Sequence, residues 1–474
     1  MIGVVSSPLD ATSVDFANTM SKLKKIPSFR PPAEHPRHLW GKFLPHFDYR
    51  RIMHDYFDHF HMYHPLWLPR GSTIAAMANI AASTAGIGTF AMPYAAHRCG
   101  IVYFVLGMII TLCLMTYTQH IISHVVDLTG LHSYEMLTRK AFKESRVAEV
   151  VIEIVLIITC IGTIISAVVI VGDGASSILT GSGVSDDKES LFRFIVQLAI
   201  FLVIMLPLSL LRSVGALKYA SAFGITALFV VIIYAIGRGF DFGTSTNLKP
   251  AETTDFVSFS VGTSLLFFAL NNQFNTIEIY SELTDRTPMR YTKMIFTTML
   301  IISVLYVVMG LSELMEFGAN VTGNVLKSYD GSSPLAAVMI IAVMCKVTFS
   351  FPLLIFPTRD AILHLLGNED LKAANQKLYY GATVVIAGGS FAIGIVAPTV
   401  TTLFGIIGSL SVGTFAFILP SLYFWRFSIL SLMTEGIAPE DTLVPKVHIA
   451  VNVLNFVIGC FIIVAGTAGA LIEL

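Results

Sequence analysis

Long, unbroken blocks of apolar residues constrain this chain more than any other feature of its sequence. Clear examples read "VYFVLGMIITLCLMTY" (102–117), "IEIVLIITCIGTIISAVVIVG" (152–172) and "FRFIVQLAIFLVIMLPLSLL" (192–211). An α-helix needs roughly 20 such residues to cross the hydrocarbon of a bilayer. Backbone groups in lipid must be hydrogen-bonded within their own segment, which favours helices over open strands. The sequence therefore predicts an all-α membrane protein.

Residues 71–474 are expected to form a single transmembrane domain with eleven helices, because no linker long enough to separate two folded domains follows residue 70. Charged residues make up only 13% of the chain, about half their usual share in soluble proteins. The expected spans are 71–95, 101–126, 147–171, 192–211, 218–237, 256–281, 292–315, 334–358, 377–397, 399–425 and 446–472.

The distribution of lysine and arginine predicts how the chain is oriented in the membrane. With the N-terminus in the cytosol, most of the 30 basic residues fall in the tail and the cytosolic loops. The C-terminus is then extracellular or luminal, because the number of spans is odd. Asn320 begins the only Asn-x-Ser/Thr sequon and falls in an expected outside loop, which makes it a glycosylation candidate. The expected outside regions hold only Arg98, Lys188, Arg193, Arg238, Lys249 and Lys327.

Residues 1–70 are expected to form a cytosolic N-terminal tail, without the apolar core of a cleavable signal peptide. Segment 46–66 mixes aromatic residues, histidines and charges, which favours an amphipathic helix lying at the membrane surface. A metal site on one helix face, from His54, Asp58 and His61, is the alternative, but no compact ligand spacing supports it. We expect no metal. The formal charge of −1 argues against a nucleic-acid partner, and the sequence identifies no protein partner.

Two of the expected spans contain residues that weaken a membrane helix. In "NIAASTAGIGTFAMPYA" (79–95), Gly86 and Gly88 lie near mid-membrane, and each glycine weakens a helix by about 1 kcal/mol relative to alanine. Close helix packing would explain these small residues equally well. In "LNNQFN" (270–275), however, amides occupy positions where a lipid-facing helix would carry Leu or Ile. Polar side chains at that depth usually face a cavity or the interior of the bundle.

These two irregular spans are the first and the sixth, so each begins one of two five-span halves. Interrupted spans at corresponding positions of inverted repeats indicate a transporter binding site at the membrane midplane. Because the two spans are five apart, the halves insert with opposite topology. We therefore expect a 5+5 inverted repeat with discontinuous helices 1 and 6, plus an eleventh helix. The unwound turns would present N–H and carbonyl groups to a zwitterion.

Five motifs occur in order between about residues 75 and 425, and together they carry a family resemblance. They are Gly86, Gly88, Pro93, Tyr94, Ala95 and Gly100 in and after the first span, Tyr280, Ser281, Glu282 and Leu283 at the end of the sixth, "FGANVTGNVL" (317–326), "SFPLLIFPTRD" (350–360) and "GSLSVGTFAFILPSLYF" (408–424). With these motifs the chain resembles the amino acid/auxin permease family, part of the amino acid–polyamine–organocation superfamily.

The resemblance implies secondary active transport of amino acids by alternating access on an eleven-span inverted-repeat fold, coupled to H⁺ or Na⁺ and without any other cofactor. The chain departs from the family in two places. Many relatives carry Cys-His where this sequence has Asn272 and Gln273, and a proline where it has Glu278. The substrate of any one relative can therefore not be assigned to this chain.

We expect the backbone of a substrate to bind main-chain groups at the break in the first span and to face the break in the sixth. The residues expected at the break in the first span are Thr84, Ala85, Gly86, Ile87 and Gly88. Those expected at the break in the sixth span are Phe268, Asn271 and Asn272.

Coupling is expected to involve Asn79, Ser350 and Lys346. In sodium-using relatives, an asparagine and a hydroxyl at the positions of Asn79 and Ser350 help to hold the ion. Lys346 lies one helical turn before Ser350. Its ammonium group would replace or exclude a metal cation, which favours proton-coupled symport or exchange. The alternative is a lysine that only reaches for carbonyls or a vestibule.

Three further residues are weaker candidates. Arg70 and Asp360 could form a cytosolic gate, by analogy with the fold. Glu278 could select cationic amino acids, or could cap a helix or pair with Arg286.

The function expected from these observations is that of an amino acid permease. The alternative is an amino acid sensor that has the same fold and moves little substrate. An enzyme is not expected, because the polar residues inside the spans form no nucleophile–base pair or metal cluster. The plasma membrane is the expected location, and a vacuolar or lysosomal membrane is the second choice.

Overall fold

The structure is a computed structural model. It describes residues 71–84, 86–211, 226, 229–238, 256–329, 331–366, 376–397, 400–428 and 443–472, and within these ranges every regular element is a helix. The chain divides into two units, Met1–Phe60 and His61–Leu474, and the account below concerns the second. The tail 1–70, with its 46–66 segment and Arg70, lies outside the described residues, so what the sequence predicts for it stays a prediction.

Eight helices within the described ranges are long and apolar enough to cross a membrane. Each coincides with one of the eleven spans expected from the sequence. They are α5 (Ile101–Thr129), α7 (Arg146–Gly181), α8 (Asp186–Ile200) continued by η2 (Phe201–Met205) and α9 (Leu206–Ser209), α13 (Pro288–Phe317), α14 (Pro334–Leu365), α15 (Gln376–Val396), α16 (Val400–Ser411) continued by η7 (Val412–Ile418), α17 (Leu419–Tyr423) and η8 (Phe424–Ser428), and α19 (Leu443–Phe461) continued by η9 (Ile462–Gly466) and α20 (Thr467–Ile472).

The other three expected spans are not single long helices in the described part of the chain. Span 218–237 falls largely outside the described residues, which there include a shorter apolar helix, Phe229–Arg238. Spans 71–95 and 256–281 are both interrupted. The structure thus supports an all-helical membrane protein with eight candidate spans, and the complete eleven-span inverted repeat remains a prediction.

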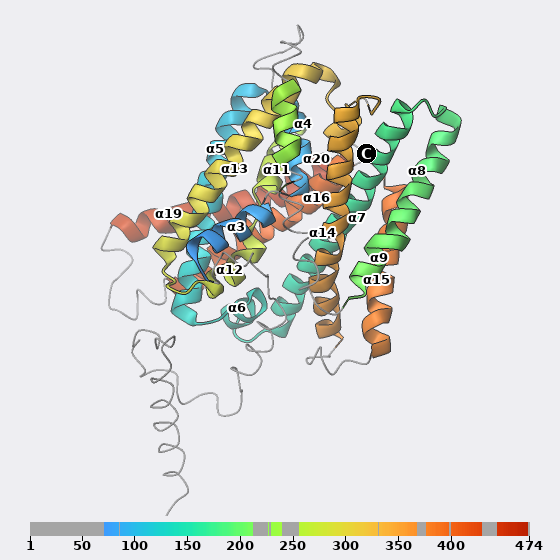
Figure 1. Ribbon diagram of the computed structural model, residues 1–474. Helices are drawn as coiled ribbons and strands as arrows, with labels where there is room; N and C mark the ends of the chain where they lie inside the picture. Colours follow the sequence, from blue (N-terminus) through green and yellow to red (C-terminus); the bar gives the residue numbers. More distant parts are fainter. Residues whose placement is uncertain are drawn as a thin grey trace, which may run out of the picture. The chain divides into compact units, whose positions relative to one another are not determined.

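The helices differ in how much of their apolar surface other helices cover. In the helix Asp187–Ser209, only 17% of an 18-residue apolar stretch is buried, whereas in Leu403–Ser428 the buried share of such a stretch is 78%. Exposed apolar side chains such as Val203 and Val385 suit contact with lipid tails. Figure 1 shows α8 and α15 beside α7 and α14 at one edge of the bundle. The segment from α16 to η8 therefore lies inside the bundle, next to the interrupted helices.

The first interruption separates α3 (Thr73–Thr84) from η1 (Ile87–Ala91) and α4 (Met92–Cys99). The Ser83 hydroxyl lies 2.8 Å from the carbonyl oxygen of Asn79, a local bond that competes with the helical ladder. Gly86 is extended, with φ −104° and ψ −153°. Pro93 lies in the first turn of α4, where its missing N–H costs nothing.

The second interruption separates α11 (Phe256–Ala269) from η4 (Gln273–Asn275) and α12 (Thr276–Glu282). The Asn271 N–H donates to the carbonyl of Phe268 at 3.1 Å, which closes the last turn of α11. Asn272 then leaves the helical region, with φ −130° and ψ 10°. Amide side chains compete with the backbone for hydrogen bonds and tolerate such conformations.

The two interrupted segments lie next to each other. Helix α3 packs against α12, and α11 packs against both α4 and η1; Figure 1 shows α3 and α12 side by side near the middle of the bundle. Gly88 permits the closest approach, because a Cβ atom there would lie 3.0 Å from the Cα atom of Ala269. The small residue thus allows the turn of one broken helix to contact the end of the other.

Candidate functional site

A side-chain hydrogen bond joins the two interruptions. The Ser83 hydroxyl lies 2.7 Å from Asn272 Oδ1, which also accepts from Asn275 Nδ2 at 3.1 Å. Ser83 belongs to the last turn of α3, and Asn272 to the non-helical stretch after α11. This contact fixes the spacing between the two breaks.

Tyr306 on α13 anchors the first interruption. Its hydroxyl donates to the carbonyl of Thr84 at 3.1 Å and lies 3.1 Å from Thr89 Oγ1. The Thr89 hydroxyl in turn donates to the carbonyl of Gly86 at 2.8 Å. In a regular helix these two carbonyls would accept hydrogen bonds from backbone N–H groups. Here they accept hydrogen bonds from side-chain hydroxyls, because a buried backbone carbonyl needs a donor.

Asn271 and Gln273 anchor the second interruption to neighbouring helices. Asn271 Nδ2 donates to Ser411 Oγ on α16 at 2.9 Å, and Gln273 Nε2 donates to Thr118 Oγ1 on α5 at 3.2 Å. The Tyr134 hydroxyl, from the short helix α6 (Tyr134–Ala141), donates to the carbonyl of Gln273. Burial raises the pKa of Tyr134 well above its usual value, so the phenol keeps its proton and acts as a donor.

Several polar atoms at the breaks have no hydrogen-bond partner among the described residues. They are Asn79 Nδ2, Thr84 Oγ1, Asn271 Oδ1 and Asn272 Nδ2, and each side chain is at least nine-tenths buried. Leaving a buried polar group unsatisfied costs about 1–3 kcal/mol. Such atoms gather where a ligand or ordered water completes the site. This set contains amide donors, an amide oxygen and a hydroxyl.

Phe268 contributes an aromatic side chain at the same place. Its ring packs against Phe404 of α16 with centroids 4.9 Å apart. Glycine at position 408 leaves room for it, because a Cβ atom there would lie 2.9 Å from the Phe268 Cβ. Phe268 is only partly buried, so part of its surface remains accessible beside the break.

Most of the substrate-binding residues expected from the sequence therefore lie along one junction. Thr84, Gly86 and Gly88 are on the side of the first break, and Phe268, Asn271 and Asn272 are on the side of the second. Ala85 and the side chain of Ile87 lie outside the described residues. The sequence did not indicate Tyr306, because a tyrosine in an apolar span carries no signal of its distant partners.

The expected coupling residues are only partly brought together. The buried Lys346 places Nζ 5.9 Å from the ring centroid of Phe90 in η1, which puts its ammonium group beside the first interruption. The Ser350 hydroxyl donates to the carbonyl of Lys346 at 2.9 Å within α14. In the described part of the chain no hydrogen bond links Asn79 to Ser350.

Of the remaining candidates, Glu278 lies directly after the second interruption, whereas Asp360 and Asn320 are on other elements. Asp360 accepts from Arg359 Nε at 3.3 Å, and its expected gate partner, Arg70, is not among the described residues. Glu278 is partly buried in the first turn of α12, and within the described ranges it forms no ion pair, with Arg286 or any other residue. Asn320 is exposed at the end of η5 (Gly318–Asn320).

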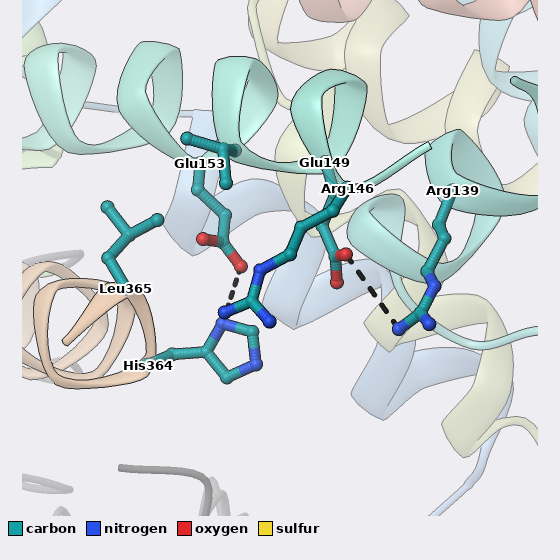
Figure 2. A pocket seen from close by; sticks show the side chains of 7 residues that line it. Arg139, Arg146, Glu149, Glu153, His364 and Leu365 are labelled. Carbon is teal, nitrogen blue, oxygen red and sulfur yellow. Dashed lines mark ion pairs between the residues drawn. The ribbon is translucent and has the colours of Figure 1, made fainter. Parts of the chain in front are cut away.

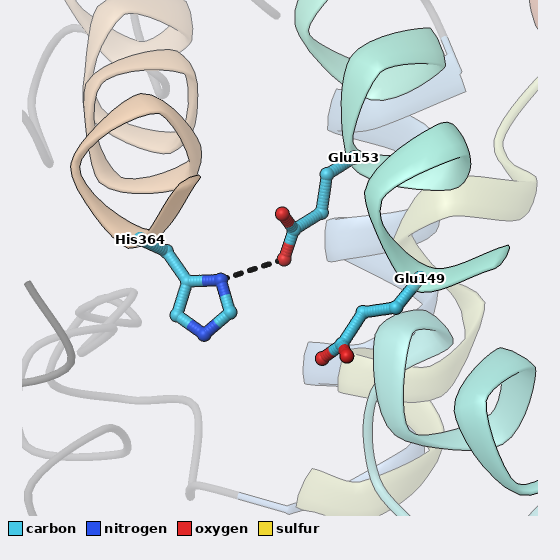
Figure 3. A group of neighbouring side chains, drawn as sticks. All are labelled: Glu149, Glu153 and His364. Carbon is cyan, nitrogen blue, oxygen red and sulfur yellow. Dashed lines mark ion pairs between the residues drawn. The ribbon is translucent and has the colours of Figure 1, made fainter. Parts of the chain in front are cut away.

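A small pocket of about 50 Å³ lies between the start of α7 and the end of α14 (Figure 2). Glu153 is buried and accepts from His364 Nδ1 at 2.7 Å, while Glu149 lies 3.9 Å from Arg139. One possible ligand atom of each of Glu149, Glu153 and His364 lies within 4.8 Å of the others. Figure 3 shows these three side chains in one group. A cation could bridge them, but Arg139 and Arg146 line the same pocket, and their positive charges disfavour a metal ion there.

A second polar cluster, which the sequence did not single out, lies at the other end of α7. The buried carboxylate of Asp173 accepts from Arg193 at 3.1 Å, Lys327 at 3.1 Å and Asn324 Nδ2 at 3.0 Å. A cleft of about 530 Å³ lies beside it, lined in part by Arg193, Lys327 and Tyr329. These contacts hold the connection between α13 and α14 on the end of α7.

Comparison of the sequence with known families matches the chain to a class of transporters. A family model described as transmembrane amino acid transporter protein matches residues 69–472. The match includes both interrupted segments and all eight candidate spans. Since it covers most of the chain, this protein belongs to the family of transmembrane amino acid transporters.

Proposed function

We propose that the chain is a secondary active amino acid transporter that binds its substrate at the two helix interruptions and works by alternating access. The observation that supports this most directly is the set of buried, unpartnered polar atoms of Asn79, Thr84, Asn271 and Asn272. They lie on two broken helices that pack against each other. In this proposal the spans complete an eleven-helix fold with a 5+5 inverted repeat and a cytosolic N-terminus.

The polarity of these atoms suits a zwitterion. The Thr84 hydroxyl and the amide nitrogens of Asn79 and Asn272 are donors for a carboxylate, and Asn271 Oδ1 is an acceptor for an ammonium group. The carbonyl ends of α3 and α11 add partial negative charge that suits the ammonium group, and the N–H ends of η1 and η4 add partial positive charge that suits the carboxylate. Phe268 is available to contact an apolar side chain. Glu278, which has no ion pair in the described structure, is the residue we assign to a preference for cationic amino acids.

We assign the coupling to protons rather than to sodium. The position of Lys346 Nζ beside η1 supports this, because a positive charge at the first interruption disfavours a second cation there. Proton-coupled symport and exchange are both compatible with this charge. We place the protein in the plasma membrane, with a vacuolar or lysosomal membrane as the alternative.

Uptake by the purified protein in liposomes tests the proposal. Labelled amino acids of different side-chain charge are supplied with a proton gradient, a sodium gradient or neither. Accumulation driven by the proton gradient is the expected result. A protein that binds amino acids but moves none, under any gradient, would instead be a sensor.

Thr84→Val identifies the binding site in the same assay. It removes a hydroxyl that has no partner among the described residues, so the fold should keep its stability. One hydrogen bond to a charged substrate contributes about 1.5–3 kcal/mol, so KM should rise at least about tenfold. Ser260→Ala is the matched control, because it removes another buried, unpartnered hydroxyl from α11, more than two turns before the break. An unchanged KM for Thr84→Val would place the substrate elsewhere.

A further inference from the structure

Glu313, near the end of α13, is a buried carboxyl whose position the proposed binding site does not explain. Its side chain has no exposed surface. Oε1 accepts from the Tyr329 hydroxyl at 2.7 Å, and Oε2 has no hydrogen-bond partner among the described residues. A carboxylate is costly to bury unless a cation or several donors surround it.

Arg238, a cation near this end of α13, is already paired with a different carboxylate. Arg238, at the end of helix Phe229–Arg238, donates to Glu316 Oε1 at 2.6 and 3.0 Å. Glu316 follows Glu313 by one helical turn, so its negative charge disfavours a second one on Glu313. Tyr234, on the same helix as Arg238, stacks edge-on against the Tyr329 ring.

Other elements packed against α13 supply no ion pair to Glu313 within the described structure. Helix α3 and η5 carry no titratable side chain. On α4, Arg98 lies over the Tyr94 ring, and a Cβ atom on Gly262 of α11 would meet the Cys99 thiol. The titratable side chains of α4 are Tyr94, His97, Arg98 and Cys99, and those of α5 are Tyr103, Cys113, Tyr117, His120, His124 and Asp127.

Tyr329 lies between the buried carboxyl and a cleft, with only 4% of its surface exposed. It lines the cleft of about 530 Å³ beside α7, and its hydroxyl is the group bonded to Glu313. Burial, and then the charge of Glu313, raise the pKa of Tyr329, so the phenol remains a proton donor at all physiological pH values. A water molecule in the cleft and Glu313 can therefore exchange a proton across one side chain.

We infer that Glu313 is the proton-binding group of this transporter, loaded from the cleft through Tyr329. The inference rests on the proposed proton-coupled transport and adds the residue that carries the proton. A hydronium ion in the cleft gives a proton to the Tyr329 oxygen while Tyr329 passes its own proton to Glu313 Oε1. The net change is one proton moved from water to the carboxylate, which becomes a neutral carboxylic acid.

The same connection provides a link between the proton and the conformation of the protein. Tyr329 bonds to Glu313 on α13, while Asn324 and Lys327 bond to Asp173 on α7. A hydrogen bond to an ionised carboxylate is roughly twice as strong as one to a neutral acid. Protonation of Glu313 therefore weakens the attachment of residues 318–329 to α13. The outer end of the bundle can then rearrange when the proton is bound.

Glu313→Gln tests the inference by separating proton coupling from transport. The variant is reconstituted in liposomes, and two rates are measured: accumulation driven by a pH gradient, and exchange of labelled for unlabelled amino acid without a gradient. We expect gradient-driven accumulation to be lost and exchange to continue at the wild-type rate. Glu316→Gln is the matched control, because it removes the neighbouring carboxylate of the Arg238 pair and leaves Glu313 able to bind a proton. Its gradient-driven accumulation should persist, with a midpoint at lower pH because the negative charge one turn from Glu313 is gone.

Tyr329→Phe provides a second test that does not depend on the folding of Glu313→Gln. The variant removes both the proton relay and the donor that stabilises the ionised carboxylate. Gradient-driven uptake should therefore slow, and the midpoint of the remaining uptake against external pH should move upward by about one pH unit. An unchanged midpoint in Tyr329→Phe overturns the inference. So does gradient-driven accumulation by Glu313→Gln, or the loss of exchange in a folded Glu313→Gln. If the wild type shows no exchange, the proposed transport function itself fails.

Discussion

The Ser83 hydroxyl lies 2.7 Å from Asn272 Oδ1, although the two residues are 189 positions apart in the chain. Each residue belongs to an interrupted helix, and each interruption is also held from the outside, by Tyr306 on α13 and by Ser411 on α16. The breaks are therefore defined structures with specific partners. A binding site made of main-chain groups needs this rigidity, because a ligand gains affinity when the groups around it are already in place.

Ser83→Ala should lower both stability and transport. The hydrogen bond to Asn272 contributes about 0.5–1.5 kcal/mol, and its loss leaves Asn272 Oδ1 with only Asn275 as a donor. Thermal unfolding in detergent measures the first effect, and uptake in liposomes measures the second. A double-mutant cycle with Asn272→Ala should give a coupling energy of about 0.5 kcal/mol or more. Ser421→Ala, which removes only a bond to the carbonyl of Phe417, is the control; additive effects would mean that the contact does not hold the breaks together.

Gly88→Ala should reduce transport strongly. The added Cβ would lie 3.0 Å from the Cα atom of Ala269, and neither backbone can move without changing the spacing of the two breaks. Gly388→Ala on α15 is the matched control, because nothing lies within 4 Å of a Cβ atom there. In a helix, alanine is favoured over glycine by about 1 kcal/mol, so the control should be slightly more stable than the wild type. Equal uptake rates for the two variants would show that the close approach is not required.

The sequence indicated the helices and the breaks because both follow from local chemistry. Apolar runs of membrane length leave few alternatives to helix, and all eight long helices coincide with expected spans. Glycines near Gly86 and amides near Asn272 weaken a helix wherever it lies, so their effect could be seen without knowledge of the neighbours.

The groups that hold the breaks could not be predicted in the same way. Tyr306 contacts Thr84 across 222 residues, and Asp173 contacts Asn324 across 151. Nothing in the sequence around Asp173 says which cations will lie beside it after folding. Glu313 is similar, because a carboxyl at the end of an expected span reads as an interfacial charge. Its burial and its bond to Tyr329 arise only when the connection after α13 folds back.

His132→Asn should remove a pH-dependent loss of stability. His132 lies in the connection between α5 and α6, with Nδ1 2.9 Å from Ser281 Oγ on α12. Burial, and then the charge of Arg286, lower the pKa of His132 in the folded protein. A lowered pKa means that stability is fully present above the unfolded value of about 6.5 and is lost as pH falls through the folded value. The unfolding temperature of the wild type should therefore drop between pH 7.5 and 5.5, and that of the variant should drop less. The same slope in both proteins would assign the effect to another group.

A buried cation beside the first interruption can take part in coupling or can have a structural role only, and Lys346→Met distinguishes between these two roles. Methionine keeps the length and apolar stem of the side chain but removes the ammonium group near Phe90. If that charge takes the place of a metal cation, uptake in sodium-free buffer should fall on the order of tenfold, the effect of losing one charged hydrogen-bonding group. Added Na⁺ should then restore part of the rate, because Asn79 and Ser350 still offer oxygen atoms and the repelling charge is gone. Lys346→Arg, which keeps the charge, is the control and should not respond to sodium. An uptake rate and pH dependence unchanged from the wild type would remove Lys346 from coupling and leave it a structural role at the junction of η1 and α14.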